Sequence, residues 1–336
     1  LNDMECEVLT SQDEAWRRGK TPPLMITAAE AIDRSPSVKS AVVYRRTGGD
    51  VPMNEGRDVY WHDLCADVSD DPASCPCEPM DSEDLLYLLY TSGTTAKPKG
   101  IVHTTGGYLV GTSTTHHYIF DVKPESVYWC AADVGWVTGH SYIVYGPLCN
   151  ATTGVLYEGT PDFPDKDRWW AIIERYKVDV VYCAPTAIRT HMKWGHEYAE
   201  KHDLSSLRVL GSVGEPINPE AWIWYRERIG AGKAPVVDTW WQTETGMIMI
   251  TPLPGITTLK PGSATKPFPT IDAAVFDEEG NEVGPGGGGY HVIRQPWPAM
   301  LRAIYQDYDR YVETHWSRLK GAYFVGDGCR IDGDGD

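Results

Sequence analysis

One run of ten residues, from Thr91 to Gly100, combines four hydroxyl side chains, two glycines and two lysines. Hydroxyl groups and backbone amides donate hydrogen bonds to phosphate oxygens, and lysines supply the countercharge. We therefore predict that this segment, called the phosphate loop below, binds the phosphates of ATP. Its binding residues would be Thr91, Ser92, Gly93, Thr94, Thr95, Lys97, Lys99 and Gly100. A Walker P-loop is excluded, because Gly-Lys is not followed directly by Ser or Thr. A solvated Thr- and Ser-rich turn remains the structural alternative.

Three further motifs accompany the phosphate loop. They are Asp133-Val-Gly-Trp-Val-Thr-Gly-His140, Gly211-Ser-Val-Gly-Glu-Pro-Ile-Asn218 and Asp238-Thr-Trp-Trp-Gln-Thr-Glu-Thr-Gly246. In this order the four motifs resemble those of the adenylate-forming superfamily, which includes acyl-CoA synthetases, peptide-synthetase adenylation domains and luciferases. Within it they look most like the AMP-forming acetyl-CoA synthetases. The resemblance is strong over residues 85–330 and weaker over residues 1–82.

The resemblance implies an acetate–CoA ligase that works in two steps. An acetate oxygen attacks the α-phosphorus of ATP, which releases diphosphate and leaves acetyl-AMP. The thiol of coenzyme A then attacks the acyl carbon and expels AMP. ATP and coenzyme A would be substrates and Mg²⁺ the cofactor. Two alternatives stay open: a ligase for propionate or another short acid, and a non-catalytic nucleotide-binding remnant.

The same resemblance implies a nucleotide site. Thr243 would donate to the α-phosphate, Glu244 would hold Mg²⁺ through hard oxygen ligands, and these two residues are expected to be catalytic. Asp327 would accept hydrogen bonds from the ribose hydroxyls, although an Asp-Gly pair is also typical of a turn. The expected ATP and AMP contacts are Gly214, Glu215, Pro216, Asp238, Thr239, Trp240, Trp241, Gln242, Thr243 and Asp327.

The substrates that react with the nucleotide would occupy two further sites. The acetate pocket would be lined by Val137, Thr138, Val213 and Trp241, where the indole leaves room for little more than a methyl group. One extra methylene changes binding by only about 1–3 kcal/mol, so some use of propionate is expected. Core packing is the alternative for either Trp240 or Trp241. The expected coenzyme A contacts are Arg17, Arg18, Gly19, Lys20, Thr138, Asp162 and Ala184, although basic residues near a terminus are usually solvated.

Composition narrows the possible partners. The 336 residues are 42% hydrophobic and 23% charged, and the formal net charge is −17. A nucleic-acid partner is not expected, because phosphate backbones need a basic face. No apolar run is long enough for a membrane span, and the acidic first residues are not a secretory signal. Eight cysteines are too few for a disulfide scaffold. We expect a cytoplasmic protein that binds small molecules and no membrane.

Apolar runs separated by helical patterns predict an α/β fold with parallel sheets flanked by helices. Strands are expected at residues 85–90, 127–132, 153–157, 178–183, 208–212 and 236–239. Helices are expected around residues 169–176, from one apolar face, and after Asn218-Pro219, from a capping side chain followed by proline. Asp277–Gly280 is typical of a hairpin turn, and Gly284–Gly289 indicates a flexible break.

These elements suggest four segments. Residues 1–84 would belong to an N-terminal region with an acidic connector at 66–84, and residues 85–270 would form the nucleotide- and acid-binding core. Residues 271–325 would form a smaller β-rich subdomain, and residues 326–336 would approach a hinge. The resemblance implies a C-terminal domain beyond Asp336 that carries a catalytic lysine. We expect that domain to be the main intramolecular partner, and the chain as given to turn over poorly.

Four positions depart from the family pattern. Ala96 stands where glycine is usual, and alanine tolerates a positive φ poorly. Lys20 stands where arginine is more frequent, which keeps the charge and loses bidentate geometry. Cys329 and Ile331 replace residues that are usually small and basic. Ala96 is the position in the phosphate loop to test first.

Overall fold

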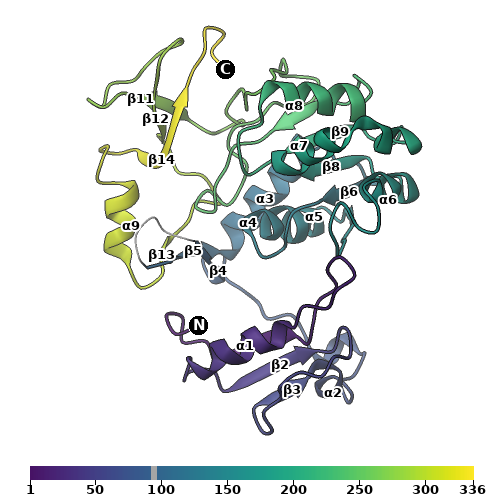
Figure 1. The fold of residues 1–336 in the computed structure, drawn as a ribbon. Helices are drawn as coiled ribbons and strands as arrows, with labels where there is room; N and C mark the ends of the chain where they lie inside the picture. The colour runs from purple at the N-terminus through teal and green to yellow at the C-terminus, as the bar shows by residue number, and fades with distance from the viewer. Residues whose placement is uncertain (92–96) are drawn as a thin grey trace. The chain divides into compact units, whose positions relative to one another are not determined.

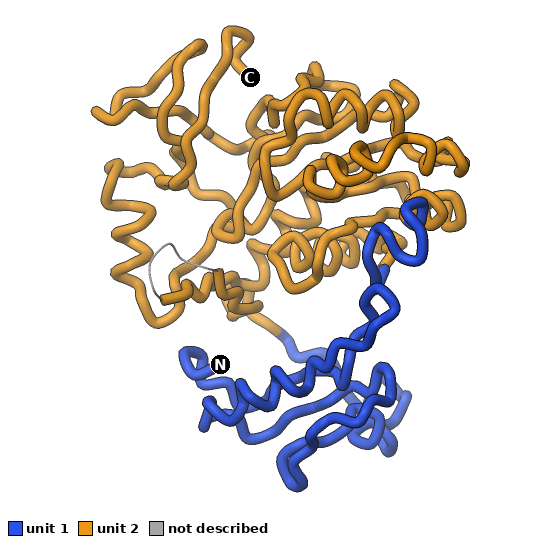
Figure 2. The backbone as a smooth tube through the Cα atoms, viewed as in Figure 1, with its two compact units in different colours: residues 1–79, 157–168 blue, residues 80–156, 169–336 orange. Residues whose placement is uncertain are grey.

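A computed structural model describes residues 1–91 and 97–336, so Ser92 to Ala96 of the phosphate loop lie outside the described residues. The chain forms two compact units (Figure 2). Unit 1 consists of residues 1–79 and 157–168, and unit 2 of residues 80–156 and 169–336. Within the described residues, no helix has both the length and the apolar character that a membrane span requires.

Unit 1 is built on a small parallel sheet. Its strands are β1 (Val8–Gln12), β2 (Ser40–Tyr44) and β3 (Asp58–Tyr60), in that order across the sheet. The helices are α1 (Leu24–Asp33), α2 (Trp61–Leu64) and the 3₁₀ helix η1 (Pro72–Ser74). Met25 and Ile32 of α1 are buried with Ala41 and Val43 of β2 in one core. The acidic residues from 66 to 79 are exposed, as the sequence predicts for a connector.

Unit 2 contains a five-stranded parallel sheet. Its strand order is β10 (Val236–Asp238), β9 (Val209–Ser212), β8 (Val180–Cys183), β6 (Val127–Cys130) and β7 (Thr153–Gly154). All five strands lie inside the apolar runs that predicted them, although β7 keeps only two of its five expected residues. The α/β fold class, with parallel sheets flanked by helices, is therefore confirmed.

Both faces of this sheet are covered, as the alternation of side chains along β6 shows. Neighbouring side chains of a strand point to opposite faces. Tyr128 contacts Phe120, which follows α3, with ring centroids 5.2 Å apart. Trp129, the next residue, contacts Trp169 of α6 at 5.2 Å. Each face therefore carries its own aromatic packing layer.

The helices of unit 2 follow the strands as connections between them (Figure 1). They are α3 (Thr105–Ile119), α4 (Val137–Gly139), α5 (Gly146–Cys149), α6 (Arg168–Tyr176), α7 (Pro185–Trp194), α8 (Pro219–Trp224) and α9 (Tyr308–His315), with π-helical turns η2 (His140–Tyr145) and η4 (Tyr225–Ile229) and a 3₁₀ helix η3 (His196–Lys201). The helices expected at residues 169–176 and after Pro219 are present. The side chain of Asn218, however, makes no capping hydrogen bond, so that part of the prediction was wrong.

Two antiparallel sheets complete unit 2. One has the order β13 (Ala303–Ile304), β5 (Lys99–Thr104) and β4 (Leu85–Thr91). The strand expected at residues 85–90 is present as β4. The expectation that it is buried was wrong, because β4 is only half-buried. The other sheet has the order β11 (Ala273–Phe276), β12 (Gly288–Ile293) and β14 (Tyr323–Arg330).

The turn and the glycine-rich segment of this last sheet had different outcomes. A turn at Asp277–Gly280 joins β11 to the chain that leads to β12, as predicted. The predicted flexible break extends too far, because Gly288 and Gly289 are part of β12. They pair with Arg330 and Cys329 of β14.

Candidate functional site

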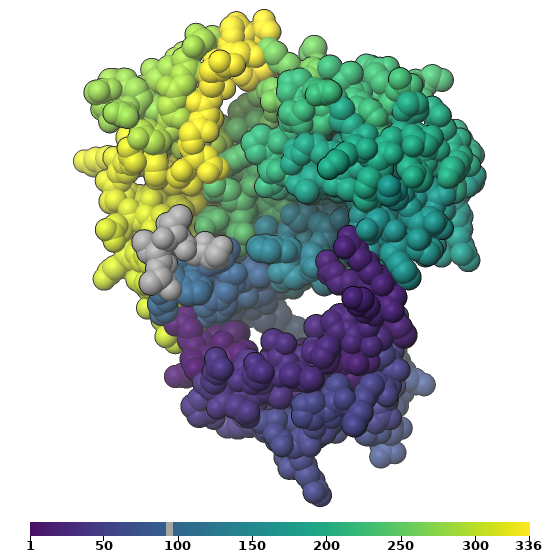
Figure 3. Space-filling view, viewed as in Figure 1, coloured from purple at the N-terminus to yellow at the C-terminus, as the bar shows by residue number. Residues whose placement is uncertain are grey.

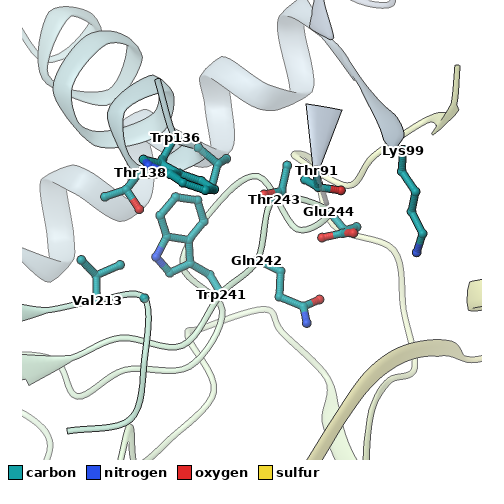
Figure 4. A pocket seen from close by; sticks show the side chains of 11 residues that line it. Thr91, Lys99, Trp136, Thr138, Val213, Trp241, Gln242, Thr243 and Glu244 are labelled. Atoms are coloured by element: carbon teal, nitrogen blue, oxygen red, sulfur yellow. The ribbon is translucent and has the colours of Figure 1, made fainter. Parts of the chain in front are cut away.

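A cavity of about 770 Å³ opens in unit 2 where strands of the parallel sheet end (Figure 4). Parallel α/β sheets bind ligands at the carboxyl ends of their strands, because the loops that follow the strands meet there. The lining residues come from the loops after β6, β9 and β10 and from β4 and β5. They are Thr91, Lys99, Trp136, Val137, Thr138, Val213, Gly214, Trp241, Gln242, Thr243 and Glu244.

The cavity has two chemically different ends. Val213, Trp241, Trp136 and Thr138 gather at one end (Figure 4). The hydroxyl groups of Thr91 and Thr243, the Glu244 carboxylate and the Lys99 ammonium lie toward the other. The four expected acid-pocket residues all line this cavity. The arrangement suits a ligand with a short apolar tail and an anionic, phosphate-like head.

The polar end contains a partly buried carboxyl group and a lysine. Burial raises the pKa of the Glu244 carboxyl, Lys99 opposes that shift, and the nearby Asp327 carboxylate adds to it. Lys99 and Thr91 face each other as a register pair of β5 and β4, so the antiparallel sheet fixes both at the cavity. A cation that bound beside Glu244 would favour its ionised form.

Residues outside the predicted site hold the loop that carries Thr243 and Glu244. Burial lowers the pKa of His103 to about 4, so its ring is neutral at pH 7. Its Nε2–H donates to the backbone oxygen of Thr243 at 2.7 Å. The buried Thr245 hydroxyl accepts from the N–H of Gln242 at 2.9 Å, and Trp297 donates to the carbonyl of Thr245 at 2.8 Å. These contacts fix the loop before a ligand arrives.

Asp327 lies on β14, outside the lining of this cavity. Its Oδ2 atom accepts from Trp240 Nε1 at 3.2 Å and from Gln242 Nε2 at 2.9 Å. Together with Trp240 and His291 it lines a second cavity of about 390 Å³. Figure 3 shows a hollow beside the yellow C-terminal strand, between that strand and the green surface of the core. Asp327 is thus oriented by two donors that extend from the loop after β10.

The other expected nucleotide residues divide into exposed and buried groups. Gly214 lines the cavity with φ +93°, a conformation that favours glycine. Glu215 and Pro216 are exposed, and the Glu215 carboxylate accepts from Thr186 N–H at 2.9 Å and pairs with Arg189 at 2.9 Å. Asp238 and Thr239 are buried beneath the cavity and do not line it.

Asp238 has an unusual titration. Burial raises the pKa of its carboxyl to about 7, and the nearby Ser212 hydroxyl and Thr239 backbone only partly offset that rise. A carboxyl group of this kind is partly protonated at neutral pH. It lies at the end of β10, next to the loop that begins with Thr239.

The phosphate-loop residues that the structure describes lie in three different environments. Thr91 and Lys99 line the cavity, and Gly100 is buried within β5. Lys97 is exposed, and its carbonyl oxygen accepts from Arg310 at 3.2 Å. Ser92, Gly93, Thr94 and Thr95, together with the departure at Ala96, lie outside the described residues.

The expected coenzyme A residues fall into two groups. Arg17, Arg18, Gly19 and Lys20 form a tight turn in unit 1, in which the backbone groups of Arg17 and Lys20 bond to each other at 2.9 Å. A cavity of about 450 Å³ is lined by Arg17, Arg18, Lys20, Thr21 and Pro22. Asp162, also in unit 1, pairs with Arg18 at 3.0 Å. Thr138 and Ala184 belong to unit 2.

Comparison with known proteins places this site in a family. The sequence model of the family described as AMP-binding enzyme matches residues 1–303. The chain is 59% identical over 335 residues to the acetyl-coenzyme A synthetase of Rubrobacter xylanophilus, covering 100% of this chain and 52% of that protein. It is 57% identical to the protein of the same name from Streptomyces avermitilis, covering 100% of this chain and 51% of that protein. It is 52% identical to the one from Chlorobaculum tepidum, covering 100% of this chain and 50% of that protein.

The chain spans about half the length of these curated relatives. The family match, in contrast, extends over nearly the whole of the chain, including every strand end that borders the cavity. The chain therefore belongs to the family of AMP-binding enzymes.

Proposed function

We propose that the chain supplies the ATP- and acetate-binding part of an AMP-forming acetate–CoA ligase, which converts ATP, acetate and coenzyme A to acetyl-CoA, AMP and diphosphate. The observation that carries this proposal is the two-ended cavity. Its apolar end, at Val213 and Trp241, has the polarity for a short apolar group. Its polar end, at Lys99, Thr243 and Glu244, suits phosphate.

In the first step the acetate carboxylate would lie between the two ends. Its oxygen attacks the α-phosphorus of ATP, the bond from that phosphorus to the bridging oxygen breaks, and diphosphate leaves. Thr243 would donate to an α-phosphate oxygen, and Lys99 would stabilise the negative charge that develops. Positioning and electrostatic stabilisation of this kind supply the catalysis without a protein nucleophile. His103 supports the step by holding the backbone of Thr243.

The residues at the polar end also fit a magnesium ion. Mg²⁺ prefers oxygen ligands and is usually bound by one or two carboxylates together with phosphates. Glu244 offers such a carboxylate inside the cavity, and the hydroxyl groups of Thr91 and Thr243 line the same end. A magnesium ion held there would neutralise phosphate charge. We propose Glu244 as its protein ligand.

The second step needs coenzyme A, whose thiol attacks the acyl carbon and expels AMP. We propose that Arg17, Arg18 and Lys20 bind its phosphates, since they line one cavity with exposed basic groups. The site of action would be the cytoplasm, where the eight free cysteines stay reduced.

The central test measures binding of unreactive adenylate analogues to the chain. Ethyl-AMP, propyl-AMP and butyl-AMP copy the adenylates of acetate, propionate and butyrate without the reactive carbonyl group. We expect ethyl-AMP to bind tightest, with a loss of about tenfold or more for each added methylene. Titration calorimetry measures the three affinities. Equal affinities for the three esters would contradict acetate as substrate, and tightest binding of propyl-AMP would favour the propionate alternative.

A Trp241→Gly variant tests the same proposal from the side of the protein. Removing the indole should widen the apolar end, so propyl-AMP and butyl-AMP should bind at least as well as ethyl-AMP. The control is Trp61→Gly, which removes a half-exposed indole of unit 1. The proposal fails if Trp241→Gly leaves the order of the three affinities unchanged.

A further inference from the structure

We propose that Tyr182 is a positioning residue for acyl-chain selectivity, because it holds the indole of Trp241 in one orientation at the apolar end of the cavity. This inference rests on the proposed function and deepens it. Trp241 forms the wall that a longer acid would meet, and Tyr182 lies behind that wall on β8. The phenol of Tyr182 does not line the cavity, so it acts only through Trp241.

An ordered chain of hydrogen bonds connects the indole to the parallel sheet. Trp241 Nε1 lies 3.1 Å from the Tyr182 hydroxyl oxygen. That oxygen lies 2.7 Å from Thr239 Oγ1. Thr239 Oγ1 in turn lies 2.7 Å from the backbone oxygen of Ser212. The hydrogen bonds therefore connect the loop after β10, which carries both Trp241 and Thr239, to Tyr182 on β8 and to Ser212 on β9.

The chemistry of these groups fixes the direction of each bond. An indole N–H only donates, so the Tyr182 oxygen accepts from it. The backbone oxygen of Ser212 only accepts, so Thr239 donates its proton there. Tyr182 must then donate its own proton to Thr239. Each of the three protons is therefore used in one hydrogen bond of the chain. The indole keeps its own hydrogen bond in only one orientation.

Packing prevents Tyr182 from turning away from the indole. Its side chain is fully buried and meets the rings of Phe120 and Tyr142 edge-on, at centroid distances of 4.8 and 5.7 Å. Tyr142 also meets the Trp241 ring edge-on at 5.0 Å. The Tyr142 side chain is held in turn by a hydrogen bond, because its hydroxyl accepts from the backbone N–H of Ile248 at 2.8 Å. The orientation of the indole is thus set by Tyr182 of β8 and Tyr142 of η2 rather than by the exposed part of its own loop.

A longer acyl chain would have to displace the Trp241 ring and break its bond to Tyr182. A Tyr182→Phe variant removes that bond and keeps the ring of residue 182. The indole can then shift at lower cost, so the selectivity against the longer chain should fall. A neutral hydrogen bond of this kind corresponds to roughly a fivefold change in an equilibrium constant.

The experiment measures the affinities of ethyl-AMP, propyl-AMP and AMP alone for the wild type and for Tyr182→Phe. We expect the ratio of ethyl-AMP to propyl-AMP affinity to fall about fivefold in the variant, while the affinity for AMP stays within about twofold. The matched control is Tyr128→Phe, another fully buried tyrosine of the same sheet that does not line the cavity, and it should keep the wild-type ratio. A purely structural role of Tyr182 would weaken all three ligands together and would overturn the inference.

A second pair of variants keeps the inference testable if Tyr182→Phe does not fold. Thr239→Ser keeps the hydroxyl that Tyr182 bonds, and Thr239→Val removes it. The valine variant should lower the ethyl-to-propyl ratio and the serine variant should not. Equal ratios in the two variants would overturn the inference. Failure of the proposed function is distinguishable, because the wild type itself would then show no preference for ethyl-AMP.

Discussion

Two histidines each bind a backbone carbonyl of a loop that lines the cavity. The Nε2 atom of His103 lies 2.7 Å from the Thr243 oxygen, and the Nδ1 atom of His140 lies 3.0 Å from the Trp136 oxygen. The ring of Tyr87 contacts both histidine rings, at 5.3 and 4.8 Å. Tyr87 and the two histidines therefore connect the loop at the apolar end of the cavity to the loop at its polar end.

Replacing His103 tests this role at the residue scale. His103→Leu removes the N–H group that donates to the Thr243 carbonyl. An acceptor left without its donor costs about 1–3 kcal/mol, and this cost weakens the loop that binds the ligand. We expect AMP to bind about tenfold more weakly to the leucine variant, while the ethyl-to-propyl selectivity stays unchanged. His103→Gln places an amide N–H near the Nε2 position and should recover most of the affinity. Titration with AMP checks both variants, and equal losses in the two would show that the hydrogen bond is unimportant.

The sequence predicted the lining of the cavity better than its support. Val213, Trp241 and Glu244 stand in motifs with recognisable chemistry, so their place in the site could be expected. His103 and Tyr182 stand in apolar strands and carry no local signal. Their partners are 140 and 59 residues away along the chain, and only the folded topology brings them together.

At the scale of elements, α3 is shaped by the need to pack closely. A Cβ atom added at Gly111 would lie 2.7 Å from both the Ala299 Cβ and the Met247 Sδ. Atoms of this kind do not approach so closely, so glycine is required there. The closely packed segment matters for the site, because Leu301, two residues beyond Ala299, donates its N–H to the Glu244 carbonyl at 3.0 Å.

A Gly111→Ala variant should therefore destabilise the protein despite the better helix propensity of alanine. Overpacking costs about 1–3 kcal/mol, while the propensity gain is about 1 kcal/mol. We expect a net loss of up to about 2 kcal/mol in the free energy of unfolding, measured by urea denaturation. Gly154→Ala is the control, because an added Cβ meets nothing within 4 Å there. Equal stability of the Gly111 variant and the wild type would contradict the close packing.

The hydrophobic pattern predicts where strands lie, but not which strands pair. Apolar runs gave the positions of β6, β8, β9 and β10, because a strand buried on both faces is apolar throughout. The same pattern at β4 does not reveal its partner, and the structure pairs it antiparallel with β5. Glycines at the start of β12 look like a break in the sequence. Their backbone groups nevertheless pair with β14, an interaction that no side-chain pattern encodes.

At the scale of the whole molecule, unit 2 buries several ionisable side chains. Burial lowers the pKa of His116 to about 3 and that of His191 and His291 to about 4, as it does for His103. The unfolded chain takes up a proton at each of them near pH 6.5, whereas the folded chain does so only near pH 4 or below. The unfolded state therefore binds more protons between these values, and stability falls as the pH falls through this window.

Asp238 acts in the opposite direction. Its folded-state pKa of about 7 lies above its ordinary value of 3.8, so the folded chain takes up the proton first. Protonation of this carboxyl below pH 7 therefore stabilises the fold. At pH 5 each of the four histidines destabilises by roughly 2 kcal/mol, and Asp238 stabilises by roughly 3 kcal/mol. The four histidines together outweigh Asp238, and Glu244, whose pKa is also raised by burial, offsets part of the remainder.

We therefore expect the melting temperature of unit 2 to fall between pH 7 and pH 5, and His191 offers a test outside the site. Its ring packs among Trp169, Trp170 and Trp194, at 5.0, 4.6 and 5.1 Å. His191→Phe removes one proton uptake site, so the melting temperature should depend less steeply on pH over this interval. The exposed His196→Phe is the matched control and should keep the wild-type slope. The slope, rather than the stability at one pH, decides the outcome, because any packing change caused by phenylalanine shifts all points equally. An unchanged slope for His191→Phe would mean that the folded protein already protonates this ring near pH 6.5.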